Sequence, residues 1–337
     1  MELSELWFGL IAILFIGFFF LEGFDYGVGI LLPFLGKNDR ERREVVNSIG
    51  PVWDANEVWL ITAGGAMFAA FPNWYATLFS GFYLALFLIL VALIFRGVAF
   101  EFRSKDKHPN WRTFWDWAIF FGSAVPALLW GVAFANIVRG VPIDADMHFT
   151  GNLLTLLNPY GLLGGLVTLT LFTLHGALFL ELKTDGDIRR RVDGVVKRVL
   201  PVVVLLTLGF VAFSAAETTM FDDVNFVQII ALVGAVGGLL GAGYTSMQRR
   251  FGLAFIGSGL AIVFVAVLLF ASLFPNVMPS STDDAFSLTV YNASSSQYTL
   301  QIMTVVALIF VPVVLIYQGW TYWVFRHRIT SDGELEY

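Results

Sequence analysis

The sequence lacks cysteine altogether, has only four histidines among its 337 residues, and carries little charge. Without cysteine the chain has no disulfide, thiolate metal site or iron–sulfur cluster. Charged residues make up 14% of it, whereas soluble domains carry about 25%. In place of charge the chain has 57% hydrophobic residues, including 34 phenylalanines and 10 tryptophans. This balance excludes an ordinary soluble protein.

Several apolar segments reach the roughly 20 residues that a helix needs to cross a bilayer. They are too long and unbroken to be barrel strands, so the sequence predicts an all-α integral membrane protein. The opening "MELSELWFGL" is acidic where a secretory signal is basic, which favours an uncleaved first anchor. We expect about nine transmembrane helices, over residues 6–35, 52–71, 74–102, 113–138, 158–182, 199–217, 226–247, 251–273 and 299–325.

The positive charges test this count. Of the 20 Lys and Arg residues, 18 lie in alternate connections (36–51, 103–112, 183–198, 249–250) or just after the last helix. Cytoplasmic connections of membrane proteins are enriched in Lys and Arg. The pattern therefore predicts an N-terminus outside and a C-terminus in the cytoplasm. The other long connections, "GVPIDADMHFTGN" and residues 274–298, are expected to be ordered caps on the outer side.

The expected helices suggest two four-helix bundles plus one additional helix within a single membrane domain, 1–337. The first bundle would cover 1–140, the second 158–273, and the ninth helix 299–325. "FFFLEGFDYGVG" and "LFTLHGALFLEL" each precede a basic connection. An internal duplication is one interpretation, but these segments are too short to establish it.

Acidic residues inside the expected helices are the main chemical signal. Glu22 and Asp25 are one helical turn apart, and so are Asp54 and Glu57 in "WDANEVWL". Gly23 and Gly27 lie beside the first pair and favour a close helix neighbour. The expected topology places all of these acids toward the cytoplasmic side. The candidate proton-path residues are Asp54, Asp25, Glu22, Glu57, Glu101 and Asp116, with Arg96 and Arg103 as candidate ion-pair partners.

Charges within a membrane span usually face protein or water, and they mark ion and proton routes or buried ion pairs. Both interpretations stay open from the residues alone. For Asp54 a third one exists, because an acid in the first turn of a helix also suits the helix dipole.

A redox centre within this chain is not indicated. A membrane haem usually needs His or Met axial ligands, and His175 is the one histidine inside an expected helix. A lone intramembrane histidine is more often a hydrogen-bonded packing residue. No phosphate-binding loop, dinucleotide fingerprint or catalytic triad is evident. We therefore expect no catalytic, cofactor-binding or metal-binding residues here, and no nucleic-acid partner.

Seven segments together resemble subunit II of bacterial cytochrome bd quinol oxidase, in order along the chain. They are "GFDYGVG" (23–29), "WDANEVWLITAGGAMFAAFP" (53–72), "FSGFYLALFLILVALIFRGVAFEFRSK" (79–105), "WDWAIFFGS" (115–123), "GVAFANIVRGVP" (131–142), "FPNVMPSS" (274–281) and "NASSSQYTLQIMT" (292–304). The block 53–72 is the most specific of them.

The resemblance implies a terminal oxidase of the cell membrane that oxidises quinol and reduces oxygen to water. Subunit I of the family carries the quinol site and the b-type and d-type haems. Subunit II is its nine-helix, pseudo-symmetric partner and lacks the haem ligands. A small accessory membrane subunit, lipid and a structural quinone in this subunit are further expectations.

The resemblance also implies roles for single residues. Asp54 matches the acid linked to proton uptake from the cytoplasm, Glu22 and Asp25 match acids of the family's first motif, and Trp59 matches a residue beside an oxygen path. A purely structural assembly subunit is the first alternative. The second, an ion-coupled transporter, would have broken helices around a midplane site, whereas the acids here lie off-centre.

Overall fold

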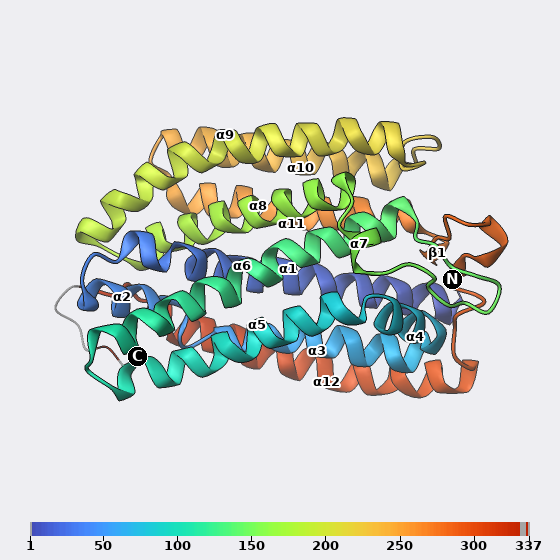
Figure 1. Ribbon diagram of the computed structural model, residues 1–337, viewed down its shortest axis with the longest axis horizontal. Helices are drawn as coiled ribbons and strands as arrows, with labels where there is room; N and C mark the ends of the chain where they lie inside the picture. Colours follow the sequence, from blue (N-terminus) through green and yellow to red (C-terminus); the bar gives the residue numbers. More distant parts are fainter. Residues whose placement is uncertain (1, 331–334, 336–337) are drawn as a thin grey trace.

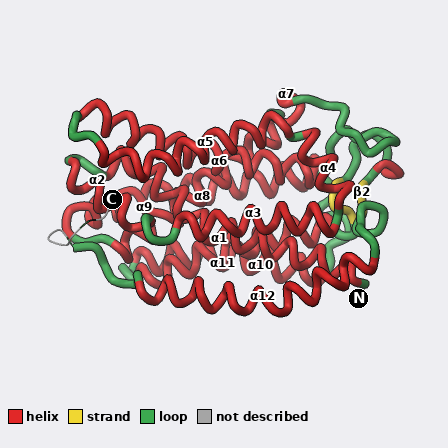
Figure 2. The backbone as a smooth tube through the Cα atoms, turned by 90° about the horizontal axis from the view of Figure 1, so that it is seen from below, coloured by secondary structure: helices red, strands yellow, loops and turns green. Residues whose placement is uncertain are grey.

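The computed structural model describes residues 2–330 and 335 and shows an elongated bundle of long helices lying along a common direction (Figures 1 and 2). The helices are α1 (Leu3–Leu35), α2 (Asp39–Ile49), α3 (Trp53–Ala70), α4 (Pro72–Gly81), α5 (Tyr83–Phe102), η1 (Arg103–Lys105), α6 (Pro109–Arg139), α7 (Leu153–Leu156), α8 (Pro159–Lys183), α9 (Gly186–Glu217), α10 (Phe226–Met247), α11 (Phe251–Leu273), η2 (Asp284–Phe286) and α12 (Gln297–Val324). Two short strands, β1 (Asn276–Met278) and β2 (Leu288–Thr289), complete the described structure.

The all-α membrane class is confirmed. Eight helices in the described residues are long and apolar enough to cross a membrane: α1, α5 with η1, α6, α8, α9, α10, α11 and α12. The expected second span, 52–71, is the helix α3, but it is not among the eight because Asp54, Asn56 and Glu57 make its first turns polar. The count of nine spans and the orientation of the chain stay predictions.

The expectation of one continuous helix over 74–102 is wrong. The chain breaks at Phe82, which has non-helical dihedral angles between α4 and α5. Phe149, from the connection between α6 and α7, packs against Phe82 with ring centroids 5.8 Å apart. It also fills the space beside Gly81, where a Cβ would lie 2.5 Å from the Phe149 Cβ. The bend thus makes room for a side chain from a distant segment.

Two of the expected basic connections contain helix. Residues 39–49 form α2, which begins with Asn38 accepting a hydrogen bond from the Glu41 N–H and buries Val45, Val46 and Ile49. Residues 186–198 form the first turns of α9, where Ile188, Val192 and Val196 recur every four residues and are buried. Each segment has an apolar stripe among its charges, and this stripe packs on the bundle.

Helix α1 is the centre of the bundle and packs against α3, α6, α8 and α11. Its closest neighbour is α8, where Gly27 faces Gly176. A Cβ added at Gly27 would lie 2.8 Å from the Gly176 Cα and would overlap the Phe172 carbonyl oxygen. The predicted close approach beside Gly23 and Gly27 is therefore confirmed, and α8 is the helix that makes it.

Replacing Gly27 with alanine is expected to destabilise the protein by about 1–3 kcal/mol, because overpacking forces two backbones apart. The matched control is Gly9→Ala in the same helix, where an added Cβ would meet nothing within 4 Å. Thermal unfolding of the purified complex should show a lowered midpoint for Gly27→Ala only. Equal midpoints for the two variants would show that the α1–α8 contact tolerates widening.

The connections at one end of the bundle form an ordered cap, as expected. Strand β1 pairs antiparallel with β2, and the Ser281 N–H donates to the Val141 carbonyl at 2.9 Å, which joins the two long connections. The Ser295 N–H donates to the Ala70 carbonyl at 2.8 Å and so ties the cap to the end of α3. In Figure 1 this end also holds the N-terminus, whereas α2 and the C-terminus lie at the opposite end, called the basic end below.

Candidate functional site

Arg96 of α5 is the centre of a buried ionic site. Its side chain is 0% exposed, and its Nη1 lies 2.5 Å from the Glu22 Oε1 of α1 and 2.6 Å from the Glu57 Oε1 of α3. Gly122 of α6 allows this arrangement, because a Cβ there would lie 2.6 Å from the Arg96 Cβ. Three helices therefore meet on one guanidinium. Glu22, Asp25, Glu57 and Arg96 are called the Arg96 cluster below.

Aromatic rings surround the same guanidinium. The Arg96 Cζ lies 5.0 Å from the ring centroid of Tyr26, 5.5 Å from that of Phe100 and 5.7 Å from that of Trp53. Rings within about 6 Å of a cation attract it through their negative faces. They also exclude bulk water, which strengthens the two ion pairs.

Asp25 belongs to a second network that reaches α12. The Asn56 Nδ2 donates to the Asp25 Oδ2 at 2.6 Å, and the Asn56 Oδ1 accepts from the Tyr322 hydroxyl at 2.7 Å and from the Gln318 Nε2 at 3.3 Å. The Trp59 Nε1 in turn donates to the Gln318 Oε1 at 2.9 Å. Asn56 and Gln318 were not among the predicted site residues. The available signal for Gln318 was one amide within the otherwise apolar "VVLIYQGW".

Asp54 lies at the open side of the Arg96 cluster. It is exposed, and it makes no hydrogen bond or ion pair with any residue that the structure describes. Glu57, one helical turn further along α3, has an 18% exposed side chain, and Glu22 beyond it has 0%. The acids thus run from the surface to the interior.

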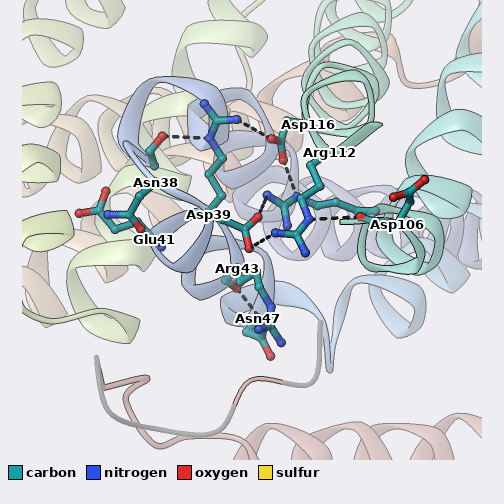
Figure 3. Close-up of polar contacts among 11 residues, drawn as sticks. Asn38, Asp39, Glu41, Arg43, Asn47, Asp106, Arg112 and Asp116 are labelled. Atoms are coloured by element: carbon teal, nitrogen blue, oxygen red, sulfur yellow. Dashed lines mark hydrogen bonds and ion pairs between the residues drawn. The ribbon is translucent and has the colours of Figure 1, made fainter. Parts of the chain in front are cut away.

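Asp116 lies in a separate cluster at the basic end (Figure 3), and Arg103 is one of its ion-pair partners. The Asp116 Oδ1 accepts from the Arg103 Nε at 2.6 Å, and its Oδ2 accepts from the Arg42 Nη1 at 2.7 Å. Asp39 accepts from Arg103 at 3.0 Å and from Arg112 at 2.6 Å. These contacts tie α2, η1 and α6 together.

The predicted site residues are thus divided. The structure brings Glu22, Asp25 and Glu57 together around Arg96, with Asp54 beside them. Asp116 and Arg103 have partners of their own, and Glu101 is exposed and has no ion pair with a described residue.

Glu41, which lies outside the expected spans, connects α2 to α9 at the basic end. Burial alone would raise the pKa of Glu41, but the ion pair with Arg191 of α9 (2.7 Å) and the hydrogen bond from the Lys37 N–H (2.7 Å) outweigh it and lower this pKa. A lowered pKa means that the contact stabilises the fold above the ordinary value of 4.5 and is lost as the pH falls below it. The contact is therefore intact at neutral pH.

His175 does not fit the role of a haem ligand. Its Nδ1 lies 2.7 Å from the Ser258 hydroxyl and its Nε2 lies 3.2 Å from the Phe20 carbonyl oxygen. Its ring stacks on Phe255 with centroids 4.4 Å apart. Both nitrogens are therefore already engaged within the protein. The other histidines, at 108, 148 and 327, are exposed and lie outside the long helices.

A cavity of about 600 Å³ lies between α1, α3, α4, α5, α6 and α11, and its lining is almost entirely apolar. Trp74 and Trp130 line it and are 2% and 7% exposed. Neither indole Nε1 has a hydrogen-bond partner among the described residues. A buried indole N–H usually finds an acceptor. Two tryptophans that line this apolar cavity therefore each carry an indole N–H without an acceptor among the described residues.

The fold is shared with a solved structure described as "The structure of bd oxidase from Geobacillus thermodenitrificans". The TM-score is 0.80 with 16% sequence identity, and the match covers 96% of this chain and 99% of the other. At this identity the likeness shows the fold alone.

The sequence comparisons go further. The profile of the family "Cytochrome bd terminal oxidase subunit II" matches residues 3–325. The Bacillus subtilis (strain 168) protein named cytochrome bd ubiquinol oxidase subunit 2 is 45% identical over 336 residues, covering 100% of this chain and 99% of the relative. The Escherichia coli (strain K12) protein named cytochrome bd-I ubiquinol oxidase subunit 2 is 41% identical over 368 residues, covering 98% and 96%.

The chain belongs to the cytochrome bd terminal oxidase subunit II family. It is accordingly a multi-pass protein of the bacterial cell membrane and a subunit of a quinol oxidase complex, an oxidoreductase. The resemblance found in the sequence is confirmed.

Proposed function

We propose that this subunit takes protons from the cytoplasm into the oxidase complex through Asp54 and the Arg96 cluster. Reduction of oxygen to water consumes protons, so the complex needs a path that carries them to the haems. The bonded state of His175 supports haems in subunit I rather than in this chain.

The observation that carries this proposal is the graded exposure of the acids. Asp54 is exposed, Glu57 is partly exposed, and Glu22, which contacts the same Arg96 Nη1 as Glu57, is fully buried. An ion-pair network that served only to hold the helices together would need Glu57, Arg96 and Glu22. It would not need Asp54, which pairs with no described residue.

Asp54→Asn tests the proposal cleanly because Asp54 makes no ion pair whose loss would unfold the protein. We expect an assembled complex with normal haem content and a quinol oxidase rate lowered by at least about tenfold, a barrier increase of about 1.4 kcal/mol. The control is Asp146→Asn, an equally exposed acid at the capped end. A wild-type rate in Asp54→Asn would leave only the structural role.

Subunit I is proposed to pack against the face formed by α3, α5 and α12. Only 6% of the apolar window of α12 is buried within this chain, and α3 exposes Val58, Ile61 and Phe68. Hydrogen bonds from Gln318 and Tyr322 nevertheless fix α12 against α3. A partner on this face would enclose Asp54. Lipid and any small accessory subunit would then cover the remaining apolar surface, including α9 and α10.

The apolar cavity is proposed to hold a quinone as a structural ligand. A quinone ring is apolar at its edges and has two carbonyl acceptors, which suit the unsatisfied indole N–H groups of Trp74 and Trp130. The cavity volume of about 600 Å³ lies within the usual range for small-molecule sites. Oxygen passage is the second candidate role for this cavity, because Leu60 beside Trp59 also lines it.

Trp74→Phe and Trp130→Phe are each expected to lower quinone occupancy of the purified complex. Losing one hydrogen bond of about 0.5–1.5 kcal/mol weakens binding roughly two- to tenfold. Quinone extracted per haem is the measurement. The control is Trp115→Phe, since Trp115 is also buried with an unpartnered Nε1 but does not line the cavity. Unchanged quinone content in both cavity variants would contradict the assignment.

A further inference from the structure

Three side chains form a continuous chain of hydrogen bonds that ends on Asp25. The Trp59 Nε1 donates to the Gln318 Oε1 at 2.9 Å, and the Gln318 Nε2 donates to the Asn56 Oδ1 at 3.3 Å. The Asn56 Nδ2 then donates to the Asp25 Oδ2 at 2.6 Å. Trp59, Gln318 and Asn56 are called the amide chain below. It runs from α3 to α12, back to α3 and on to α1.

The chemistry of Trp59 gives the amide chain its direction. An indole N–H only donates, so the Gln318 oxygen faces Trp59 and the Gln318 nitrogen faces Asn56. The Asn56 oxygen therefore faces Gln318, and its nitrogen faces Asp25. The Tyr322 hydroxyl donates to the same Asn56 oxygen at 2.7 Å and fills its second lone pair. A turned Asn56 amide would place its N–H groups against those of Gln318.

Packing fixes the amide chain in place. A Cβ added at Gly17 of α1 would overlap the six-membered ring of Trp59, so this ring fills a gap that only a glycine leaves. Asn56 is 0% exposed and Gln318 is 9% exposed. Hydrogen bonds in such buried surroundings are electrostatically stronger than in water. The amide that reaches Asp25 is therefore held in one orientation.

We propose that the amide chain positions Asp25, because it holds a donor on one carboxylate oxygen and leaves the other for a proton. The free oxygen is the Asp25 Oδ1, and neither it nor the Glu22 Oε2 accepts from a donor among the described residues. The Glu22 and Asp25 side chains are in hydrogen-bond contact with each other. Two carboxyl groups form such a bond only when one of them carries a proton.

This inference rests on the proposed proton function and adds residues to it. A proton passes from Glu22 to the Asp25 Oδ1: the O–H bond at Glu22 breaks, and one at Asp25 forms. The negative charge moves from Asp25 to Glu22, and no electron is transferred. Asn56 keeps its bond to the Asp25 Oδ2 throughout, so the carboxyl group stays turned toward Glu22. Trp59, Gln318 and Asn56 are thus positioning residues for the proton transfer.

Holding α12 in place is the competing role for the same bonds. The Trp7 Nε1 donates to the Leu300 carbonyl oxygen at 3.2 Å and already ties the other end of α12 to α1. A merely holding role needs the bond from Gln318 to Asn56, but not the further bond from Asn56 to Asp25. A measurement on Asp25 itself therefore separates the two roles.

The test is the infrared difference spectrum of the purified whole complex on reduction, in the carboxyl stretching region. The Asp25 band is the one that Asp25→Asn removes. We expect this band to shift in Gln318→Met and in Tyr322→Phe, each of which removes one donor to Asn56 and keeps a side chain of similar size. A band that stays in place in both variants, or no band that depends on Asp25, would overturn the proposal.

The control is Tyr160→Phe, which also removes one hydroxyl that links two helices. Tyr160 is 1% exposed and bonds to Ser214 between α8 and α9, so the Asp25 band should not move in this variant. The quinol oxidase rate per haem is the second readout. We expect it to fall by about two- to tenfold in Gln318→Met and in Tyr322→Phe, the range for one lost hydrogen bond, and to stay at the wild-type value in Tyr160→Phe.

The two proposals fail separately. A shifted Asp25 band together with a wild-type rate in Asp54→Asn would refute proton uptake through Asp54 but keep the positioning of Asp25 by the amide chain. A slow Asp54→Asn enzyme with an unmoved Asp25 band in Gln318→Met and Tyr322→Phe would do the reverse.

Discussion

Arg96→Met is expected to lose about 3–5 kcal/mol of stability, the usual cost of removing one partner from a buried ion pair. The substitution leaves Glu22 and Glu57 facing each other without the cation that both contact. Methionine has a similar length and adds no polar atom, so the effect comes from the missing charge rather than from a cavity. We expect little assembled complex, measured as haem per membrane protein.

A rescue experiment separates charge from packing. Adding Glu22→Gln and Glu57→Gln to Arg96→Met removes the two unpaired charges, and we expect much of the assembly to return without activity. If the triple variant assembles no better than Arg96→Met alone, the aromatic packing of Arg96 against Tyr26 and Phe100 matters more than its ion pairs.

Asp25→Asn is expected to have the opposite pattern, with normal assembly and a quinol oxidase rate lowered by about tenfold or more. The introduced amide oxygen still accepts the hydrogen bond from Asn56, so the network to α12 persists. What is lost is a group that can carry a proton. Oxygen consumption per haem is the measurement.

Asp116→Asn is the matched contrast to Asp25→Asn. Asp116 is just as buried, but it holds Arg42 and Arg103 at the basic end. Its loss should lower assembly while the rate per haem stays near wild type. A normal rate in Asp25→Asn would remove Asp25 from the proton route.

Much of the fold can be predicted from the sequence because a membrane-spanning helix requires a long run of apolar residues. The predicted helix boundaries are wrong where contacts between distant segments determine the local structure. The break at Phe82 accommodates Phe149, which lies 67 residues further along the chain, and no local pattern shows this. The basic segments before α3 and within α9 are helical because their apolar stripes pack on the bundle. The division into bundles 1–140 and 158–273 stays a prediction, since α1 and α8 pack against each other across it.

The candidate site was predictable in part. The spacing of Glu22, Asp25, Asp54 and Glu57 placed four acids near one another. It could not show that Arg96 bonds to two of them, nor that Asp116 belongs to a different cluster, because which helix faces which depends on packing. No pattern in the sequence distinguishes Asn56 from the acids beside it. Its amide joins α1, α3 and α12.

Time-resolved proton uptake tests the central claim most directly. The fully reduced complex in lipid vesicles is mixed with oxygen, while a pH-sensitive dye reports protons and haem absorbance reports oxygen binding. We predict that Asp54→Asn binds oxygen at the wild-type rate but takes up protons at least about tenfold more slowly. Proton uptake at the wild-type rate in that variant would contradict a proton route through this subunit.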